Sequence, residues 1–141
     1  MEQEIKNTYI RYCSLIENIQ KEQANQRQAF IRIDRKCYEA GNELCLAHAE
    51  NYIKRMRAHD REVKNISKRA EDNCYKIFPK NYDYNQLFSK AKKSEEELNM
   101  MKRFQDCSNE YNEEAITVIQ NDIEFFKKVN KKLSQFMLPK R

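Results

Sequence analysis

Cys45 and His48 are three residues apart, a spacing that places two metal-binding side chains on one face of a helix. Zinc ligands normally come as close pairs from two separate segments. This sequence has no second local pair, and His59 lies about three turns further along a helix. We therefore expect Cys45 to be a packed thiol, and we predict neither a metal site nor any other cofactor site.

Nucleophilic catalysis would need a cysteine or serine beside a histidine, with an orienting acid and donors for an oxyanion. The two histidines lie instead in or near a segment rich in charged residues, such as Arg55 and Asp60, which is typical of a solvated helix face. With one glycine, Gly41, the chain cannot build a glycine-rich phosphate loop. We predict that the chain is not an enzyme and has no small-molecule substrate.

The five cysteines form an odd set with irregular spacing: Cys13, Cys37, Cys45, Cys74 and Cys107. Such a set does not indicate a disulfide framework, so we expect reduced thiols packed as small apolar side chains. In a helical hairpin with its turn at residues 79–82, the pair nearest to bridging is Cys45 and Cys107. Their distances from the turn differ by about 13 Å along the axis, which is too far for a disulfide.

The composition indicates long helices. One Gly, two Pro and 35% charged residues leave few turn-forming positions for a compact fold with several turns. The apolar share of 40% and the mean hydropathy of -1.02 fit a narrow buried stripe and a large exposed surface. These values are typical of an all-α protein that forms coiled coils.

Apolar positions between Ile5 and Ala47 follow the alternating four- and three-residue steps of a coiled coil. The phase then slips, as a stutter would cause, and the pattern resumes up to Pro79, which ends it. The pattern predicts one helix over about residues 3–78. Within it, Gly41 permits a slight bend or the close approach of another chain, or is merely tolerated.

A second helix is expected after a short turn at residues 79–82. Asp83 can cap this helix, with Gln86 three positions on, as an acidic variant of the capping box. An apolar pattern then continues until Leu138-Pro139 ends it. The pattern predicts a helix over about residues 83–138.

Two long helices joined by one short turn pack most simply side by side and antiparallel. We therefore predict a single all-α domain over residues 1–141, built as a long helical hairpin or coiled coil. In an alternative arrangement, the polar residues 20–28 form a loop and the chain becomes an elongated three-helix bundle. We favour a continuous helix there because Gln, Glu, Lys, Arg and Ala are good helix formers.

The two predicted helices differ in length by about 30 Å, so roughly the first 20 residues would overhang the hairpin without an internal partner. An isolated helix of that length is marginal in water. The overhang nevertheless carries a regular apolar seam, and an exposed seam indicates a binding surface. We predict that another protein or a second copy binds the residues of this seam, which are Ile5, Tyr9, Tyr12, Ile16 and Ile19.

The formal charge of +5 gives a mild preference for acidic partners. Most basic clusters are interrupted by acidic residues, as is usual on an exposed coiled-coil face. The most one-sided cluster lies near the C-terminus and is interleaved with aromatic residues. We predict contact with an acidic surface for Lys127, Lys128, Lys131 and Lys132, and we do not expect nucleic acid to be the partner.

The sequence has no apolar run long enough to span a bilayer, and its first residues lack the apolar core expected of a signal peptide. Early Glu residues also argue against an organelle-targeting helix. We expect a cytoplasmic structural subunit of a hetero- or homo-oligomer with other coiled-coil or filament proteins. By analogy alone, we predict that this assembly is cytoskeletal and microtubule-based, such as an axoneme in a cilium, with tubulin as a candidate partner. The alternatives are a soluble coiled-coil tethering or adaptor complex, and a peripheral subunit of an organellar complex or ribosome.

Overall fold

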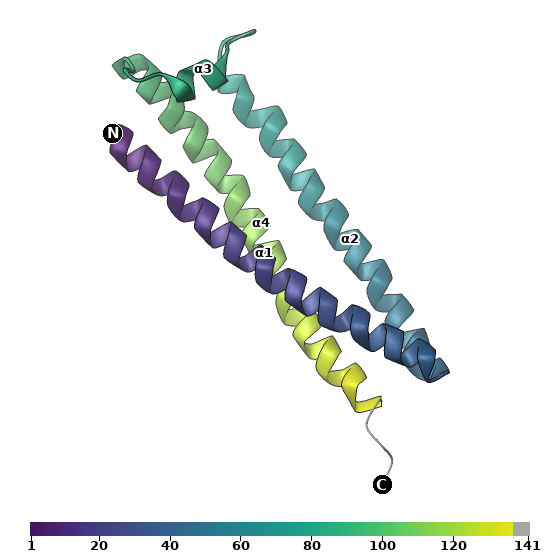
Figure 1. The fold of residues 1–141 in the computed structure, drawn as a ribbon. Coiled ribbons are helices and arrows are strands. Elements are labelled where there is room, and N and C mark those ends of the chain that lie inside the picture. Colours follow the sequence, from purple (N-terminus) through teal and green to yellow (C-terminus); the bar gives the residue numbers. More distant parts are fainter. Residues whose placement is uncertain (137–141) are drawn as a thin grey trace.

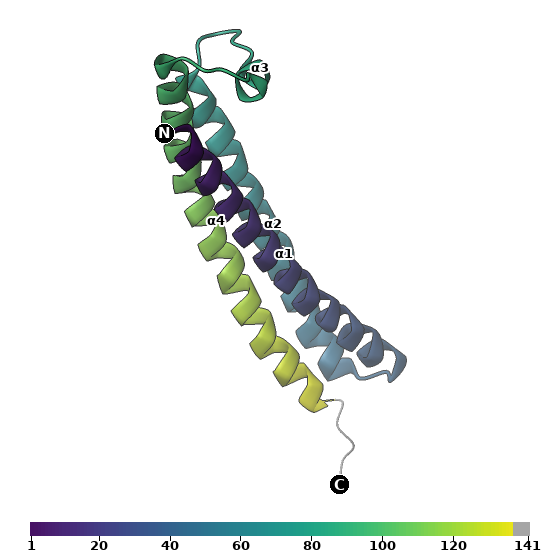
Figure 2. The same ribbon diagram turned by 60° about the vertical axis from the view of Figure 1, so that its left-hand side comes forward.

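A computed structural model describes residues 1–136 as a bundle of three long helices with short helical segments at one end (Figures 1 and 2). The helices α1 and α4 run in the same direction, and α2 runs antiparallel to both. No strand occurs within the described residues, which confirms the all-α prediction. The elements are α1 (Glu2–Glu39), α2 (Glu43–Cys74), the 3-10 helix η1 (Tyr75–Ile77), α3 (Tyr84–Ser89) and α4 (Glu95–Phe136).

The helix expected over residues 3–78 is two helices, because the chain turns sharply after α1. Gly41 has a φ of +62°, and its N–H donates to the carbonyl of Tyr38 at 3.1 Å. The N–H of Asn42 reaches back to Cys37 at 3.0 Å, which completes a Schellman motif. The side chain of Asn42 also accepts a hydrogen bond at the start of α2, so one short turn ends one helix and caps the next.

The alternative loop at residues 20–28 is wrong, because α1 is helical throughout that stretch, as the residue propensities predicted. The three-helix arrangement that this alternative implied is nevertheless present. Its connection lies at residues 40–42 instead, so the chain folds back about 15 residues later than the alternative required.

The turn at residues 79–82 is confirmed, and Asp83 caps α3 by accepting from the N–H of Gln86 at 3.1 Å. The helix expected from residue 83, however, stops at Ser89. A new helix, α4, starts after a capping box in which Ser94 and Glu97 each accept the other's backbone N–H, at 3.1 and 2.9 Å. The expected end near residue 138 lies outside the described residues.

The core runs the length of the bundle, so the predicted overhang is absent. We call the end that holds the start of α1 and α3 the apical end, and the end that holds the α1–α2 turn the basal end. Ile5 packs in the apical core with Met101, and Ile19 packs in the middle with Ile119. Since α2 folds back after residue 39, α4 lies along nearly the whole of α1. Ile5 and Ile19 are therefore only 6% and 7% exposed.

A buried polar network joins the three long helices near the middle of the bundle. Asp122 of α4 is 5% exposed and accepts from Gln23 at 2.8 Å and from the guanidinium of Arg27 at 3.2 Å, both on α1. His59 of α2 lies 3.7 Å from the same carboxylate, and Arg27 also pairs with Asp60 of α2 at 2.8 Å. Because an unpaired buried charge is costly, the network fixes the relative register of the three helices.

We expect Asp122→Ala to lower the free energy of unfolding by about 3 kcal/mol, because the substitution leaves the guanidinium of Arg27 without its buried partner. Urea denaturation followed by circular dichroism measures the change. Glu124→Ala is the matched control, since Glu124 is an exposed carboxylate on the same helix and should cost less than about 0.5 kcal/mol. Equal losses in the two variants would contradict a structural role for the network.

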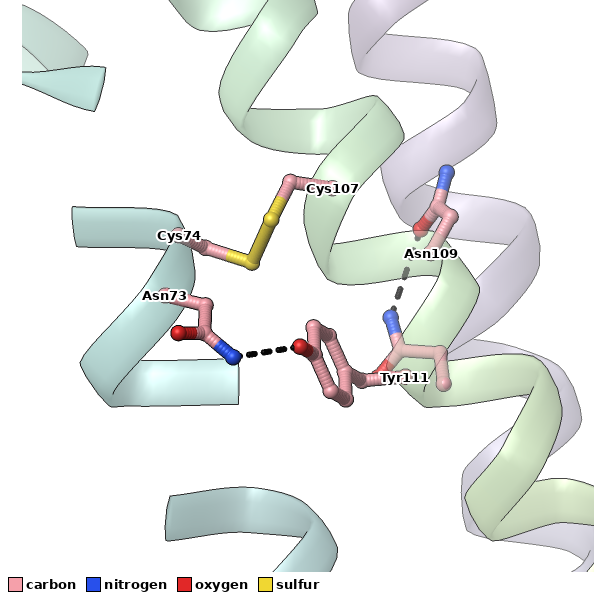
Figure 3. Close-up of a disulfide and its surroundings, with 6 residues drawn as sticks. Asn73, Cys74, Cys107, Asn109 and Tyr111 are labelled. Carbon is pink, nitrogen blue, oxygen red and sulfur yellow. Dashed lines mark hydrogen bonds between the residues drawn. A yellow bond between two sulfur atoms is a disulfide. The ribbon is translucent and has the colours of Figure 1, made fainter. Parts of the chain in front are cut away.

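Four of the five cysteines form disulfide bonds, so the expectation of reduced thiols is wrong for these four. Cys37 bonds to Cys45 across the α1–α2 turn, with their Cα atoms 5.8 Å apart. Cys74 at the end of α2 bonds to Cys107 of α4, with a Cα separation of 5.7 Å (Figure 3). The turn at Gly41 brings the first pair together. The second pair forms because the segment between α2 and α4 lets α4 extend past the end of α2.

Removing the Cys74–Cys107 bond should destabilise the protein more than removing the Cys37–Cys45 bond. The bonded residues are 33 apart in the first case and 8 in the second. The loop entropy lost in the unfolded chain is then worth about 3.7 and about 2.5 kcal/mol. Denaturation of the two double-serine variants compares them directly, since each variant loses one bridge and gains two hydroxyls. A larger loss from the Cys37–Cys45 variant would contradict this order.

Candidate functional site

An apolar cleft of about 690 Å³ opens at the apical end between α1 and α4. On α1 its lining includes Tyr9 and Ile16, on α4 it includes Met101 and Phe104, and Phe88 of α3 contributes from the end. The volume lies within the usual range of binding sites, about 300–1,000 Å³. The cleft therefore has the size and the lining of a recognition site.

A smaller cavity of about 330 Å³ lies between α2 and α4 and shares Phe104, Ser108 and Asn112 with the cleft. Figure 1 shows α1 and α2 diverging toward this end. In the middle of the bundle α4 presents large buried residues such as Ile119 and Ile123. At the level of Ser108 and Asn112 its side chains are short and polar, so they do not fill the space between the diverging helices.

Four of the five residues predicted to bind a partner line the cleft, and Ile19 does not. Full exposure was the wrong expectation for Ile5 and Ile19, because α4 covers both. Tyr12 and Ile16 are half-buried, and Tyr9 remains 66% exposed at the rim. The structure thus brings together part of the predicted surface, while partner binding itself stays a prediction.

Sequence reasoning missed the part of the cleft that α4 contributes. One feature of the sequence could have indicated this part of the cleft, namely a gap in the apolar pattern. Four positions after Phe104 an apolar residue was expected, and the sequence has Ser108 there. A polar residue at a core position suggests that the neighbouring helices do not close over it. Phe88 was assigned to a continuing helix, although it lies on the short α3 that closes the end of the cleft.

The tyrosines of the cleft have polar partners inside the chain. The hydroxyl of Tyr12 donates to the carboxylate of Glu113, and this hydrogen bond raises the pKa of Tyr12 above its ordinary value. The side chain of Cys13 likewise raises the pKa of Tyr9 through a hydrogen bond. Both tyrosines are therefore neutral at physiological pH and present rings and hydroxyl groups to a ligand.

Most of the charge at the cleft is already balanced. Lys93, whose side chain is 7% exposed, pairs with Glu2 at 3.0 Å and donates to the carbonyl of Lys90 at 2.7 Å. The amide of Gln105 donates to the carbonyl of Ile5 at 2.7 Å. Among the charged residues that line the cleft, Lys6 alone makes no ion pair within residues 1–136. The cleft is therefore suited to an apolar contact flanked by one available cation.

The basic cluster of α4 lies away from the cleft, toward the basal end. Lys127 pairs with Glu22 at 3.0 Å and with Glu124 at 3.4 Å, and the hydrogen bond to Glu22 contributes most to raising the pKa of Lys127. The other three members of the cluster, Lys128, Lys131 and Lys132, are exposed. The predicted contact with an acidic surface therefore rests on these three lysines.

The Cys45–His48 pair does not form half of a metal site, because the sulfur of Cys45 is bonded to Cys37. Within residues 1–136 no group of three or more His, Cys, Asp or Glu side chains is arranged to hold a metal ion. In the same range, none of the helices combines the length and apolar character needed to cross a membrane.

Comparisons with known proteins gave no match to this chain among family models, curated sequences or solved structures.

Cys13 should be the only cysteine that a maleimide labels in the native protein, because it is the one free and exposed thiol of the described residues. Mass spectrometry should show one adduct per native chain and five after reduction in denaturant. Cys13→Ser should abolish native labelling. Native labelling that persists in this variant would contradict the two disulfide assignments.

Proposed function

We propose that this chain is a non-enzymatic structural subunit that binds another protein chain through the apical cleft. The observation that carries the proposal is the open cleft itself, whose apolar lining leaves Tyr9 66% and Phe88 45% exposed. Exposed apolar groups gathered at one concave site mark interaction surfaces. Aromatic residues are also enriched in the centres of protein interfaces.

The divergence of α1 and α2 suggests what kind of element the cleft accepts. Helices bind readily in apolar grooves, where residues on one face of the incoming helix supply the contacts. A helix from another chain that lies in the cleft, against α1 and α4, would give this end of the molecule a four-helix arrangement. Such binding requires no chemical step, which is consistent with a structural role.

The identity of the assembly is a separate question, and the disulfide bonds bear on it. Disulfides persist in oxidising compartments and are rare in the cytosol. Among the predicted assemblies, the bonds favour those in an oxidising compartment over cytoplasmic ones. A cytoskeletal, microtubule or axonemal assembly, with the exposed lysines of α4 against tubulin, stays a prediction.

Phe88→Asp should weaken binding of the native protein partner at least tenfold, because it places a carboxylate against an apolar interface. The partner is first identified by cross-linking from the native source, and its affinity is then measured for each variant. Leu44→Asp is the matched control, since Leu44 is also exposed, at 58%, but lies at the basal end. Circular dichroism checks that both variants fold. Equal losses in the two variants, or none in either, would contradict binding at the cleft.

A further inference from the structure

The side of α1 that borders the cleft has an apolar centre exposed to solvent. Tyr9 is 66% and Ile10 is 59% exposed, and one turn further on lies the exposed thiol of Cys13. Tyr9 and Cys13 line the mouth of the cleft, so the exposed centre and the cleft form one continuous surface.

Charged residues flank this centre at matching distances, with a base on one side wherever there is an acid on the other. Two copies of the helix packed antiparallel would therefore place opposite charges against each other. Lys6 and Glu17 lie on opposite sides of the midpoint of residues 2–21, each about 8 Å from it along the helix axis. Glu2 and Lys21 lie on opposite sides of the same midpoint, each about 14 Å away. When two such helices pack antiparallel, Lys6 faces Glu17 of the second copy and Glu2 faces Lys21 of the second copy.

The charges in this pattern are accessible to another chain. Lys6 is exposed and makes no ion pair within residues 1–136. Glu17 and Lys21 pair with each other at 3.3 Å, yet their side chains are 67% and 71% exposed. Glu2 pairs with Lys93 and is 49% exposed. Each carboxylate can accept further hydrogen bonds, so contacts with a second copy add to the internal pairs without breaking them.

We propose that the chain forms a symmetric dimer in which α1 of a second copy lies antiparallel along α1 and covers the mouth of the cleft. The proposal rests on the proposed function, because it names the chain that the cleft binds. In a two-fold interface every contact occurs twice, so the pattern supplies four ion pairs around a doubled apolar centre. The apolar centre provides the burial, and the charges set the register and direction of pairing.

The proposed register also places the two copies of Cys13 close together. Cys13 lies about 2 Å from the midpoint along the axis, so the two thiols are offset by only about 4 to 5 Å. With packed helix axes about 8 to 10 Å apart, a short bismaleimide should join them. Cross-linking of the native chain to a covalent dimer, which Cys13→Ser abolishes, is the first expected result.

Charge reversal tests the register more sharply. In a Lys6→Glu dimer, and equally in a Glu17→Lys dimer, like charges face each other twice, so each variant alone should dimerise at least tenfold more weakly. When the two variants are mixed, every introduced charge faces an opposite one. The mixture should therefore form a heterodimer with an affinity close to that of the unaltered chain.

Sedimentation equilibrium measures these affinities at low and high salt, and circular dichroism confirms that each variant folds. Lys54→Glu is the control, because it reverses an exposed charge on α2 outside the proposed interface and should leave dimerisation unchanged. A chain that stays monomeric up to about 100 µM would overturn the proposal. So would variants that dimerise like the unaltered chain and show no preference for each other when mixed.

These outcomes are independent of the test of the proposed function. A monomeric chain whose protein partner is still lost on Phe88→Asp overturns the dimer and leaves cleft binding in place. Conversely, a dimer that charge reversal disrupts supports the pairing even where Phe88→Asp leaves binding of a different protein unchanged.

Discussion

The left-handed backbone at Gly41 determines how the rest of this molecule packs. A Cβ atom at this position would meet nothing within 4 Å, so glycine is favoured by the φ of +62° and not by close approach of another group. With the helix ended here and Asn42 capping the next one, α2 runs back along α1. Without the turn, α1 and α2 would continue as a single helix, and Ile5 and Ile19 would lie beyond the reach of α4.

The buried charges then hold the three helices in one register. Asp122 and Arg27 are near the middle of the bundle, with an aromatic and aliphatic cluster on the basal side that includes Phe30 and Phe126. The basal half is closed by this cluster and by the Cys37–Cys45 bond. In the apical half, the Cys74–Cys107 bond and the hydrogen bond from Asn73 to Tyr111 fasten α2 to α4 alone (Figure 3). The two halves therefore differ, and the cleft opens where α1 and α2 are not joined.

Helical periodicity identified which residues are buried better than it identified what buries them. The repeat that begins at Ile5 correctly marks a stripe that contacts another helix, but a heptad pattern carries no information about which helix that is. The turn at Gly41 was ambiguous from sequence, because an isolated glycine in a helical pattern is often tolerated. The start of α4 was readable in the capping-box residues Ser94 and Glu97. The disulfides were not, because pairing depends on a helix register that local sequence does not set.

The direction of the helices adds a physical reason for the antiparallel dimer. Both α1 and α4 begin at the apical end, so two positive helix termini lie there, and acidic residues in the first turns, such as Glu2 and Glu95, already balance part of that charge. In the proposed register, an antiparallel second copy places the middle of its α1, near Lys21, beside this end and keeps its own positive N-terminus away from it. A parallel copy would add a third positive terminus beside the others and would place Lys6 against Lys6 of the second copy. The dipoles and the side-chain charges therefore favour the same orientation, although each arises from a different part of the chain.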